Sequence, residues 1–192
     1  MIIAFTGPSG VGKGYAASRL REAFPAIKEI TWSTTRPLRP EEEKTTVQNR
    51  KHLPADLFAL REKERSVLLA HEAHGHRYGI LAEDRPDVGA VYLTEFNVAN
   101  IPAIAASGWQ TVLIGLVPSS IDFLHTRIVD YRRTTDSDEV ERRLASARTD
   151  LAEMERLRHR FHHILTVTPD NERTIAEDIV SIVRPFISQE LS

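Results

Sequence analysis

The chain has 192 residues, enough for one well-buried domain but not for two independent ones. A net charge of -2 and a pI near 6.5 exclude the basic field that would attract nucleic acid or an anionic membrane. The chain contains no cysteine, which excludes disulfides and thiolate metal sites and fits a reducing cytoplasm. No apolar run approaches the roughly 20 residues of a membrane-spanning helix. We therefore expect a cytoplasmic protein with neither a nucleic-acid nor a membrane partner.

The first predicted elements are a buried strand, a glycine-rich turn and a helix. Residues 2–6 form a short apolar run that stops at Gly7. A helix is predicted from about Lys13, and Pro25 ends it. A second strand is predicted within residues 27–33.

Residues 34–86 interrupt the regular alternation of strands and helices. The polar, proline-containing segment 34–51 is predicted to be exposed loop. A short helix at 56–63, a strand at 67–73 and a turn at 75–79 follow. This stretch therefore predicts a small α+β insertion.

The alternation resumes after the insertion. Strands are predicted at residues 90–94, 111–117 and 164–167, and helices at 98–106, 119–131, 140–154 and 175–186. Strands that alternate with helices indicate an α/β fold, with a parallel sheet covered on both faces.

The turn after the first strand carries a phosphate-binding motif, G-x-x-x-x-G-K. Its residues are Gly7, Pro8, Ser9, Gly10, Val11, Gly12 and Lys13. Glycines let backbone N–H groups point inward at phosphate oxygens, and the N-terminus of the next helix adds positive potential. Lys13 can follow the charge as it moves to the leaving group. We interpret the turn as an ATP-binding loop. The alternative is a glycine-rich turn without a ligand.

The motif departs from its usual form after the lysine. Gly14 stands where a Ser or Thr commonly binds Mg²⁺, and Tyr15 follows. We expect both residues to contact ATP. Because Mg²⁺ keeps much of its water, we expect it to enter with ATP, held mainly by water and phosphates. A metal site built by the protein alone is not expected.

Four segments, in this order, resemble the guanylate kinase family. They are the loop at 7–14, S-T-T-R-P-L-R-P at 33–40, E-A-H-G-H-R-Y-G at 72–79, and T-D-S-D-E-V at 135–140 with R-R-L at 142–144. The resemblance implies a P-loop kinase with a five-stranded parallel sheet core, an α+β nucleotide-monophosphate-binding lobe and a small helical lid. The single domain 1–192 would divide into a core (1–33, 87–126 and 150–192), an acceptor-binding lobe (34–86) and a lid (127–149).

The resemblance also implies an acceptor-binding set. Arg36 and Arg39 are three residues apart, and two guanidinium groups can form bidentate contacts with one phosphate. Tyr78 would meet the same phosphate, and Glu95 would meet the base or the water around the metal. The implied set is Ser33, Arg36, Arg39, Glu72, Tyr78 and Glu95. A solvated loop and ordinary packing are the alternative readings of these residues.

The catalytic residues that the resemblance implies are cationic. Phosphoryl transfer spreads negative charge over the transferred oxygens, and closing arginines stabilise that charge. The implied set is Lys13, Arg132, Arg133 and Arg143. Arginines on a helix-loop-helix can also form a solvated face.

The departures from the family gather where it reads the base. They are Trp32, Arg50, Leu69 and Ile80. A carboxylate usual at the Leu69 position can accept from two guanine N–H groups, which leucine cannot do. The first expectation is therefore ATP-dependent phosphorylation of GMP or dGMP. The alternatives are the same transfer to another phosphorylated acceptor, such as a different monophosphate or ribose 1,5-bisphosphate, or a non-catalytic binding module. The oligomeric state stays open.

Overall fold

A computed structural model describes residues 1–38, 50–73, 75–132 and 136–190. Its main elements, in chain order, are β1 (Ile2–Thr6), α1 (Lys13–Ala23), β2 (Lys28–Glu29), β3 (Trp32–Thr34), β4 (Arg50–His52), α3 (Ala55–Lys63), β5 (Val67–Ala73), β6 (His76–Leu81), β7 (Tyr92–Glu95), α4 (Ile101–Ala106), β8 (Thr111–Pro118), α5 (Ile121–Arg132), α6 (Ser137–Arg156), β9 (His163–Val167) and α7 (Ile175–Glu190). Single turns of 3₁₀ helix lie at Ala82–Asp84, Val98–Asn100 and Arg158–Arg160.

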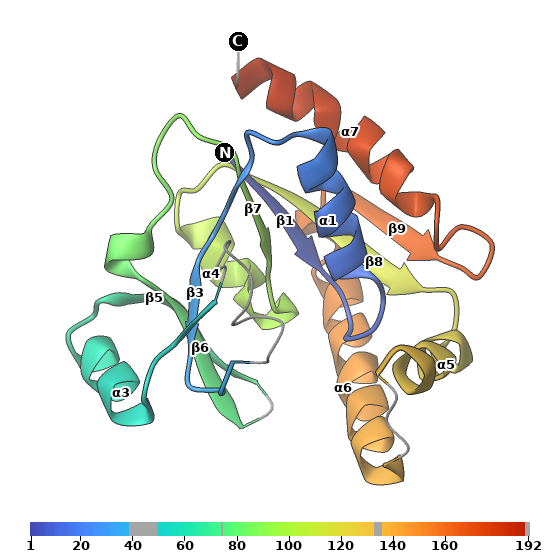
Figure 1. The fold of residues 1–192 in the computed structure, drawn as a ribbon, viewed down its shortest axis with the longest axis horizontal. Coiled ribbons are helices and arrows are strands. Elements are labelled where there is room, and N and C mark those ends of the chain that lie inside the picture. The colour runs from blue at the N-terminus through green and yellow to red at the C-terminus, as the bar shows by residue number, and fades with distance from the viewer. Residues whose placement is uncertain (39–49, 74, 133–135, 191–192) are drawn as a thin grey trace.

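The central sheet is parallel and has five strands in the order β2-β7-β1-β8-β9 (Figure 1). The predicted five-stranded parallel core is thus confirmed. From β1 the chain moves outward to β2, returns to β7 and then crosses to β8. The strand order therefore reverses at β1, and ligands of such sheets bind beyond the carboxyl ends at this point. Phe5 is level with Glu95 across β1 and β7, so both strands end together there.

Alternate residues of β1 build the two halves of the core. Ile3 and Phe5 pack with α1 and α7, while Ile2 and Ala4 pack with α4 and the end of α6. All four side chains are almost completely buried, as expected for a strand covered on both faces. Among the described helices, none combines the length and apolar character needed to cross a membrane.

Helices α5 and α6 form a third cluster beyond the end of the sheet. Leu124 and Ile128 of α5 pack against Val140 and Leu144 of α6. The side chain of Asp136 caps α6 by accepting from the first backbone N–H groups, which fixes where the helix begins. The amphipathic pattern predicted a helix over 140–154. In the structure this helix begins slightly earlier, at Ser137.

The insertion contains a second sheet, in the order β4-β3-β6-β5, beside the first one (Figure 1). Residues 50 and 51, the end of the segment predicted to be loop, belong to β4 and pair with β3. Gly79, predicted to lie in a turn, sits inside β6, and the single strand predicted within 27–33 is divided between the two sheets. These three predictions were wrong because strand pairing depends on partners distant in the sequence.

Candidate active site

The glycine-rich loop lies between β1 and α1, at the point where the strand order reverses. Gly7 and Gly12 have φ values of 143° and 111°, which side chains disfavour. A Cβ on Gly7 would also approach the carbonyl oxygen of Leu116 to 2.2 Å. The loop can therefore pass close to β8 only with glycine there. The predicted loop thus has the backbone that a phosphate-binding loop requires.

Lys13 folds back over this loop. Its Nζ donates to the carbonyl oxygens of Gly7 at 2.8 Å and Pro8 at 3.0 Å. Asp150 of α6 is within electrostatic reach of Lys13. Burial raises the pKa of Asp150 above its ordinary value, and the nearby lysine charge partly opposes that rise. The sequence reasoning missed Asp150, although it lies three residues after buried Ala147 on the same helix face.

Arg143 reaches the loop from α6. Its Nη1 donates to Ser9 Oγ at 3.3 Å, while Nε and Nη2 donate to Glu139 Oε1 at 2.8 and 2.5 Å. One of the predicted lid arginines therefore stands at the phosphate-binding loop. Arg132 ends α5, but its side chain and the whole of Arg133 lie outside the described residues.

A second arginine at the loop was missed. The Nε of Arg127 in α5 donates to the carbonyl oxygen of Gly10 at 2.9 Å, and its guanidinium forms an ion pair with Glu172. Only 12% of its side chain is exposed. Its spacing from Leu124 puts Arg127 on the apolar face of α5, a signal that could have been read from the sequence.

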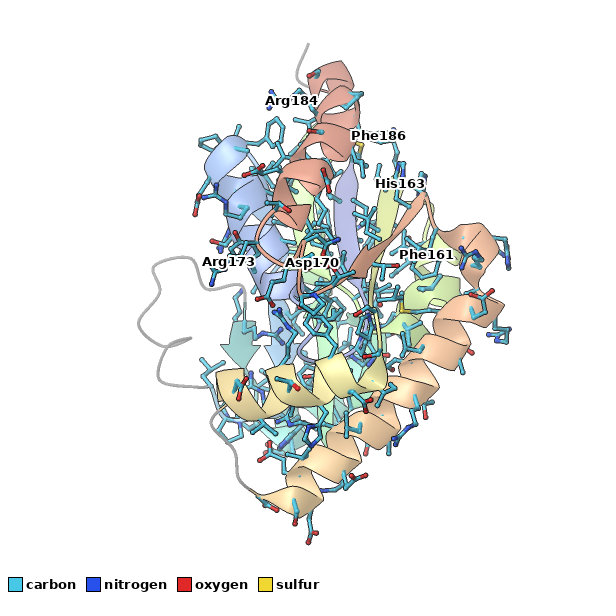
Figure 2. All side chains as sticks on the ribbon, turned by 90° about the vertical axis from the view of Figure 1, so that its right-hand side faces the viewer. Phe161, His163, Asp170, Arg173, Arg184 and Phe186 are labelled. Atoms are coloured by element: carbon cyan, nitrogen blue, oxygen red, sulfur yellow. The ribbon has the colours of Figure 1, made fainter. Side chains whose placement is uncertain are left out.

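Tyr15 connects α1 with the opposite end of the chain. Its hydroxyl donates to the carbonyl oxygen of Arg173 at 3.0 Å. Arg173 and Asp170 lie in the turn between β9 and α7 (Figure 2). The structure therefore engages the Tyr15 hydroxyl in a tertiary contact beside the loop.

The residues at the loop mouth fit a nucleotide-borne Mg²⁺. A Cβ on Gly14 would lie 3.8 Å from Glu95 Oε1, so a carboxylate borders the place of the usual loop hydroxyl. Mg²⁺ on nucleotides typically uses one or two carboxylates besides phosphates and water. In the part of the chain that the structure describes, no group of three or more His, Asp or Glu residues could hold a metal ion.

Several residues of the predicted acceptor set lie on or beside the second sheet. Arg36 follows β3, where its backbone N–H donates to Thr34 Oγ1 at 3.1 Å and its Nη1 to the carbonyl oxygen of Pro37 at 2.8 Å. Tyr78 of β6 stacks on His71, with ring centroids 5.3 Å apart. Arg39 lies outside the described residues.

Two residues of the predicted acceptor set lie on the other face of this sheet. Ser33 pairs with Gly79, and Glu72 pairs with Arg77. Tyr78 lies between Arg77 and Gly79 in β6, so its side chain points to the opposite face of the sheet. Helix α3 covers that face, because Phe58 contacts Arg77 and approaches Gly79. Ser33 is fully buried. The structure therefore brings neither Ser33 nor Glu72 together with Tyr78.

Three of the four positions that depart from the family, Trp32, Leu69 and Ile80, pack in one apolar cluster on the Tyr78 face. Trp32 is 6% exposed, and its Nε1 donates to Thr94 Oγ1 at 2.8 Å. Ile80 and Leu69 pack in the same cluster. Leu69 has a φ of 51° and lies in a β-bulge between Leu68 and His71. Bulges are frequent beside active sites, where they redirect a side chain.

The half-buried ring of His71 packs against this cluster. Its ring meets the edge of Trp32 at 5.7 Å, and Nδ1 lies 2.9 Å from the Asn100 amide nitrogen. Burial lowers the pKa of His71 below its ordinary value, and the charge of Arg50 lowers it further.

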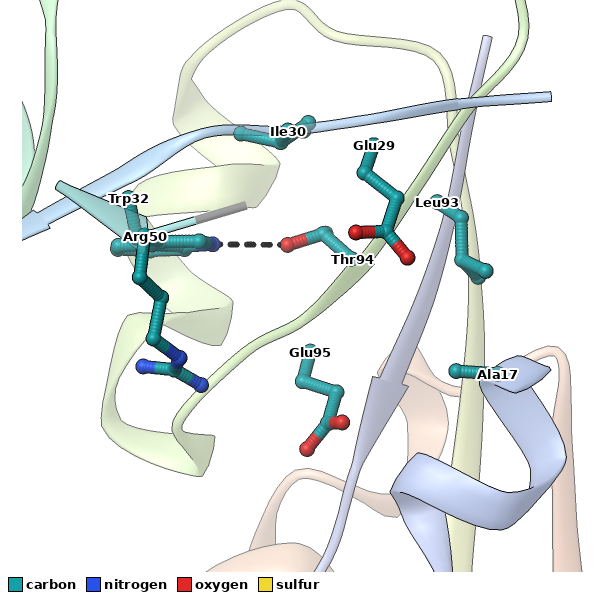
Figure 3. Close-up of a pocket in the computed structure, with 8 residues that line it drawn as sticks. All are labelled: Ala17, Glu29, Ile30, Trp32, Arg50, Leu93, Thr94 and Glu95. Atoms are coloured by element: carbon teal, nitrogen blue, oxygen red, sulfur yellow. Dashed lines mark hydrogen bonds between the residues drawn. The ribbon is translucent and has the colours of Figure 1, made fainter. Parts of the chain in front are cut away.

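A small cavity of about 40 Å³ opens between α1, the end of β7 and the second sheet (Figure 3). Its lining consists of Ala17, Glu29, Ile30, Trp32, Arg50, Leu93, Thr94 and Glu95. Glu29 Oε1 pairs with Arg21 at 2.6 Å. Glu29 Oε2 is buried and has no hydrogen-bond partner among the described residues. One guanidinium and two carboxylates thus share this cavity.

Known proteins resemble the chain in sequence and in fold. A guanylate kinase of Rhodococcus jostii is 30% identical over 158 residues, which cover 78% of this chain and 73% of that protein. One from Mycobacterium tuberculosis is 31% identical over 156 residues, covering 79% and 74% of the two chains. The crystal structure of guanylate kinase from Anaplasma phagocytophilum matches with a TM-score of 0.67 at 19% identity, over 96% of this chain and 85% of that one. No family model matches the sequence.

Proposed function

Because the chain belongs to the guanylate kinase family, we propose that it transfers the γ-phosphoryl group of ATP to GMP or dGMP. The products are ADP and GDP or dGDP. One observation carries the proposal: Arg143 of α6 reaches Ser9 of the loop that holds Lys13. Two cationic side chains from distant segments therefore contact the same loop, where the transferred phosphoryl group would lie. We place this reaction in the cytoplasm, where both substrates are supplied.

The loop would bind the phosphates of ATP. Phosphate oxygens would replace the two loop carbonyl groups as partners of Lys13 Nζ. Backbone N–H groups of residues 7–15 and the N-terminus of α1 would hold the remaining charge. Arg127 supports this arrangement from α5, since its bond to Gly10 keeps the loop in place.

The acceptor would bind between the two sheets, beside the small cavity. Arg36 and Arg39 would hold its phosphate, together with the Tyr78 hydroxyl on the same side of the second sheet. Arg50 lines the neighbouring cavity and adds a further positive charge on this side. Glu95 stands at the end of β7, between the acceptor and the ATP loop.

Transfer itself needs positioning and charge stabilisation. An oxygen of the acceptor phosphate attacks the γ-phosphorus, the bond to the bridging oxygen of ADP breaks, and Lys13 and the lid arginines stabilise the charge. The attacking oxygen is already anionic at neutral pH, so no general base is required. When bound, Mg²⁺ would neutralise part of the charge on the ATP phosphates, and Glu95 would hold the ion or its water.

Two of the three predicted parts of the domain, the lobe and the lid, would move relative to the core during the reaction. We propose that the lobe at 34–86 carries the acceptor toward the core and that the lid at 127–149 brings Arg143 onto the phosphates. Closure would exclude water, which would otherwise compete as the attacking group. Lid arginines 132 and 133 would act beside Arg143.

An assay of ADP release tests this proposal. ATP and Mg²⁺ are supplied with GMP, dGMP, the other monophosphates or ribose 1,5-bisphosphate, and Lys13→Ala serves as the inactive control. Turnover with GMP that disappears in the variant is expected. Turnover only with another acceptor would move the substrate but keep the reaction class. No turnover with any acceptor would refute the enzymatic function.

A further inference from the structure

A β-bulge in β5 determines the face of the second sheet on which His71 lies. Leu68 pairs with Ile80, and the next paired residue of β5 is His71, opposite Tyr78. Two residues therefore separate these positions in β5, but only one separates them in β6. In a regular strand, residues three apart point to opposite faces. The extra residue of the bulge thus turns His71 onto the face that carries Tyr78 and Ile80.

The backbone of this bulge is strained. Leu69 has a φ of 51°, a left-handed conformation that residues with a branched side chain rarely adopt. Such strain persists where the surrounding structure imposes it, and it gathers at functional sites. Position 69 is also where the family carries a carboxylate for guanine. The bulge therefore brings a polar ring, that of His71, to the apolar cluster from which this carboxylate is missing.

Contacts on several sides hold the His71 ring. The ring stacks on Tyr78 with an interplanar angle of 18°, and it meets the edge of Trp32. The side-chain nitrogen of Asn100, a residue only 4% exposed, lies 2.9 Å from Nδ1, and the carbonyl oxygen of Leu69 lies 3.2 Å from the same atom. A ring locked by packing and by a hydrogen bond is preorganised for recognition of a rigid base.

The contact with Asn100 decides which ring nitrogen carries the proton. An amide nitrogen can only donate, so Nδ1 of His71 accepts at 2.9 Å and the proton of the neutral ring lies on Nε2. Burial lowers the pKa of His71, which favours this neutral form. Nε2 makes no hydrogen bond with a described residue, so its N–H can donate to a ligand.

The neighbouring side chains leave this N–H as a donor for the edge of a base. Trp32 Nε1 already donates to Thr94 Oγ1, and the side chains of Leu69 and Ile80 are apolar. A donor at this place distinguishes two purines, because guanine carries the acceptor O6 where adenine carries an amine that donates. Against adenine, the N–H of His71 would stay unpaired, which weakens binding.

We propose that His71 is a specificity-determining residue, which donates from Nε2 to O6 of the guanine base, and that Asn100 positions its ring for this contact. The inference rests on the proposed function and deepens it, since it names a side chain that recognises the acceptor base. It also assigns base recognition to a position that the four family-like segments do not include.

The test compares binding of GMP with binding of 2-aminopurine riboside 5′-monophosphate, which lacks O6, by calorimetry. The amide of His71→Asn reaches the place of Nδ1 but not that of Nε2. We expect this variant to bind GMP about 3–10-fold more weakly, the usual effect of losing one neutral hydrogen bond, and to bind the analogue unchanged. His71→Gln has an amide at the place of Nε2 and should keep most of the GMP affinity. His159→Asn, at an exposed histidine, should change neither affinity.

Nitrogen NMR of the His71 ring checks the tautomer without any ligand. At a pH well above the ordinary pKa of 6.5, the spectrum should show a proton on Nε2 and none on Nδ1. Asn100→Leu removes the donor to Nδ1, and we expect both tautomers in this variant. A proton on Nδ1 in the unmodified protein would overturn the proposal, and an unchanged tautomer in Asn100→Leu would overturn the role of Asn100.

The binding results are separable from the proposed reaction. If GMP binds through His71 but is not phosphorylated, only the proposed function fails. If GMP is phosphorylated and His71→Asn weakens both nucleotides equally, or neither, only the assignment of His71 fails. If GMP does not bind, both fail. Melting temperatures of the nucleotide-free variants establish that each one folds.

Discussion

Arg143 joins Glu139 to Ser9 across the gap between α6 and the phosphate-binding loop. Two of its nitrogens donate to Glu139 Oε1, one turn earlier on the helix, and the third donates to Ser9 Oγ. The pair with Glu139 orients the guanidinium, so that a charged fork points at the loop before any substrate binds. Such preorganisation lowers the cost of stabilising charge during transfer.

Replacing Arg143 should therefore slow catalysis more than it weakens ATP binding. We expect Arg143→Ala to lower kcat by about 10²–10³-fold, the usual effect of losing one charge-stabilising donor. The KM for ATP should change little, because the loop and Lys13 remain. Arg142→Ala is the matched control, because Arg142 is exposed on the same helix and, among the described residues, its side chain donates to the carbonyl oxygen of Asp138. Equal losses in the two variants would indicate damage to α6 rather than a catalytic role.

Removal of the Lys13 amine should abolish stabilisation by nucleotide. At about 100 times its dissociation constant, ATP adds about 2.7 kcal/mol to the free energy of unfolding. For a chain of this size the rise in Tm is then about 5–10 °C. Lys13→Ala should lose most of that rise while its Tm without nucleotide stays close to that of the unmodified protein. A full shift in the variant would place the nucleotide elsewhere.

Arginines on the two sides of the second sheet should differ in their effect on the KM for GMP. We expect Arg36→Ala to raise the KM for GMP by about 10–100-fold, because a hydrogen bond to a charged group contributes about 1.5–3 kcal/mol. Arg77 lies on the face covered by α3, where it pairs with Glu62. Arg77→Ala should leave that KM unchanged. Steady-state kinetics with varied GMP would contradict the assignment if both variants behaved alike.

Gly7 should be irreplaceable for steric reasons. A Cβ at this position would lie 2.2 Å from the carbonyl oxygen of Leu116. Gly7 also has a φ of 143°, which residues with a side chain rarely adopt. Gly89 also has a positive φ, of 81°, but open space around it. Denaturant unfolding should show a loss of about 1–2 kcal/mol for Gly89→Ala from backbone strain alone. Gly7→Ala should lose clearly more, since backbone must move. Equal losses would mean that the approach to Leu116 is relieved without cost.

The half-buried His71 should make the protein less stable in mild acid. Burial, followed by the charge of Arg50, lowers its pKa below the ordinary 6.5. As the pH falls below about 6.5, the unfolded chain therefore binds more protons at this residue than the folded chain does. The free energy of unfolding decreases over this range as a result.

Thermal unfolding from neutral to mildly acid pH measures this effect. His71→Gln should show a smaller decrease of Tm over that range, and a substitution of the exposed His159 should not. His162, whose pKa is lowered by burial and by His163, leaves part of the slope in place. An identical slope in His71→Gln would mean that His71 does not contribute to the acid sensitivity.

Much of the framework was predictable because its signals are local. The apolar run at 2–6, the glycine loop and the lysine that starts α1 lie within a dozen residues, and each depends on near neighbours. The helix over 140–154 was predictable from its periodicity. Where pairing partners are distant, as for β4 and for the division between β2 and β3, prediction failed.

The site shows the same division. The sequence by itself determined that a phosphate loop with Lys13 follows a buried strand, because motif and periodicity are adjacent. Only the tertiary structure decided that Arg143 and Arg127 reach this loop, that Glu95 borders Gly14, and that Ser33 turns away from Tyr78. The physical reason is that these relationships depend on strand register and helix packing, which align residues that are far apart along the chain.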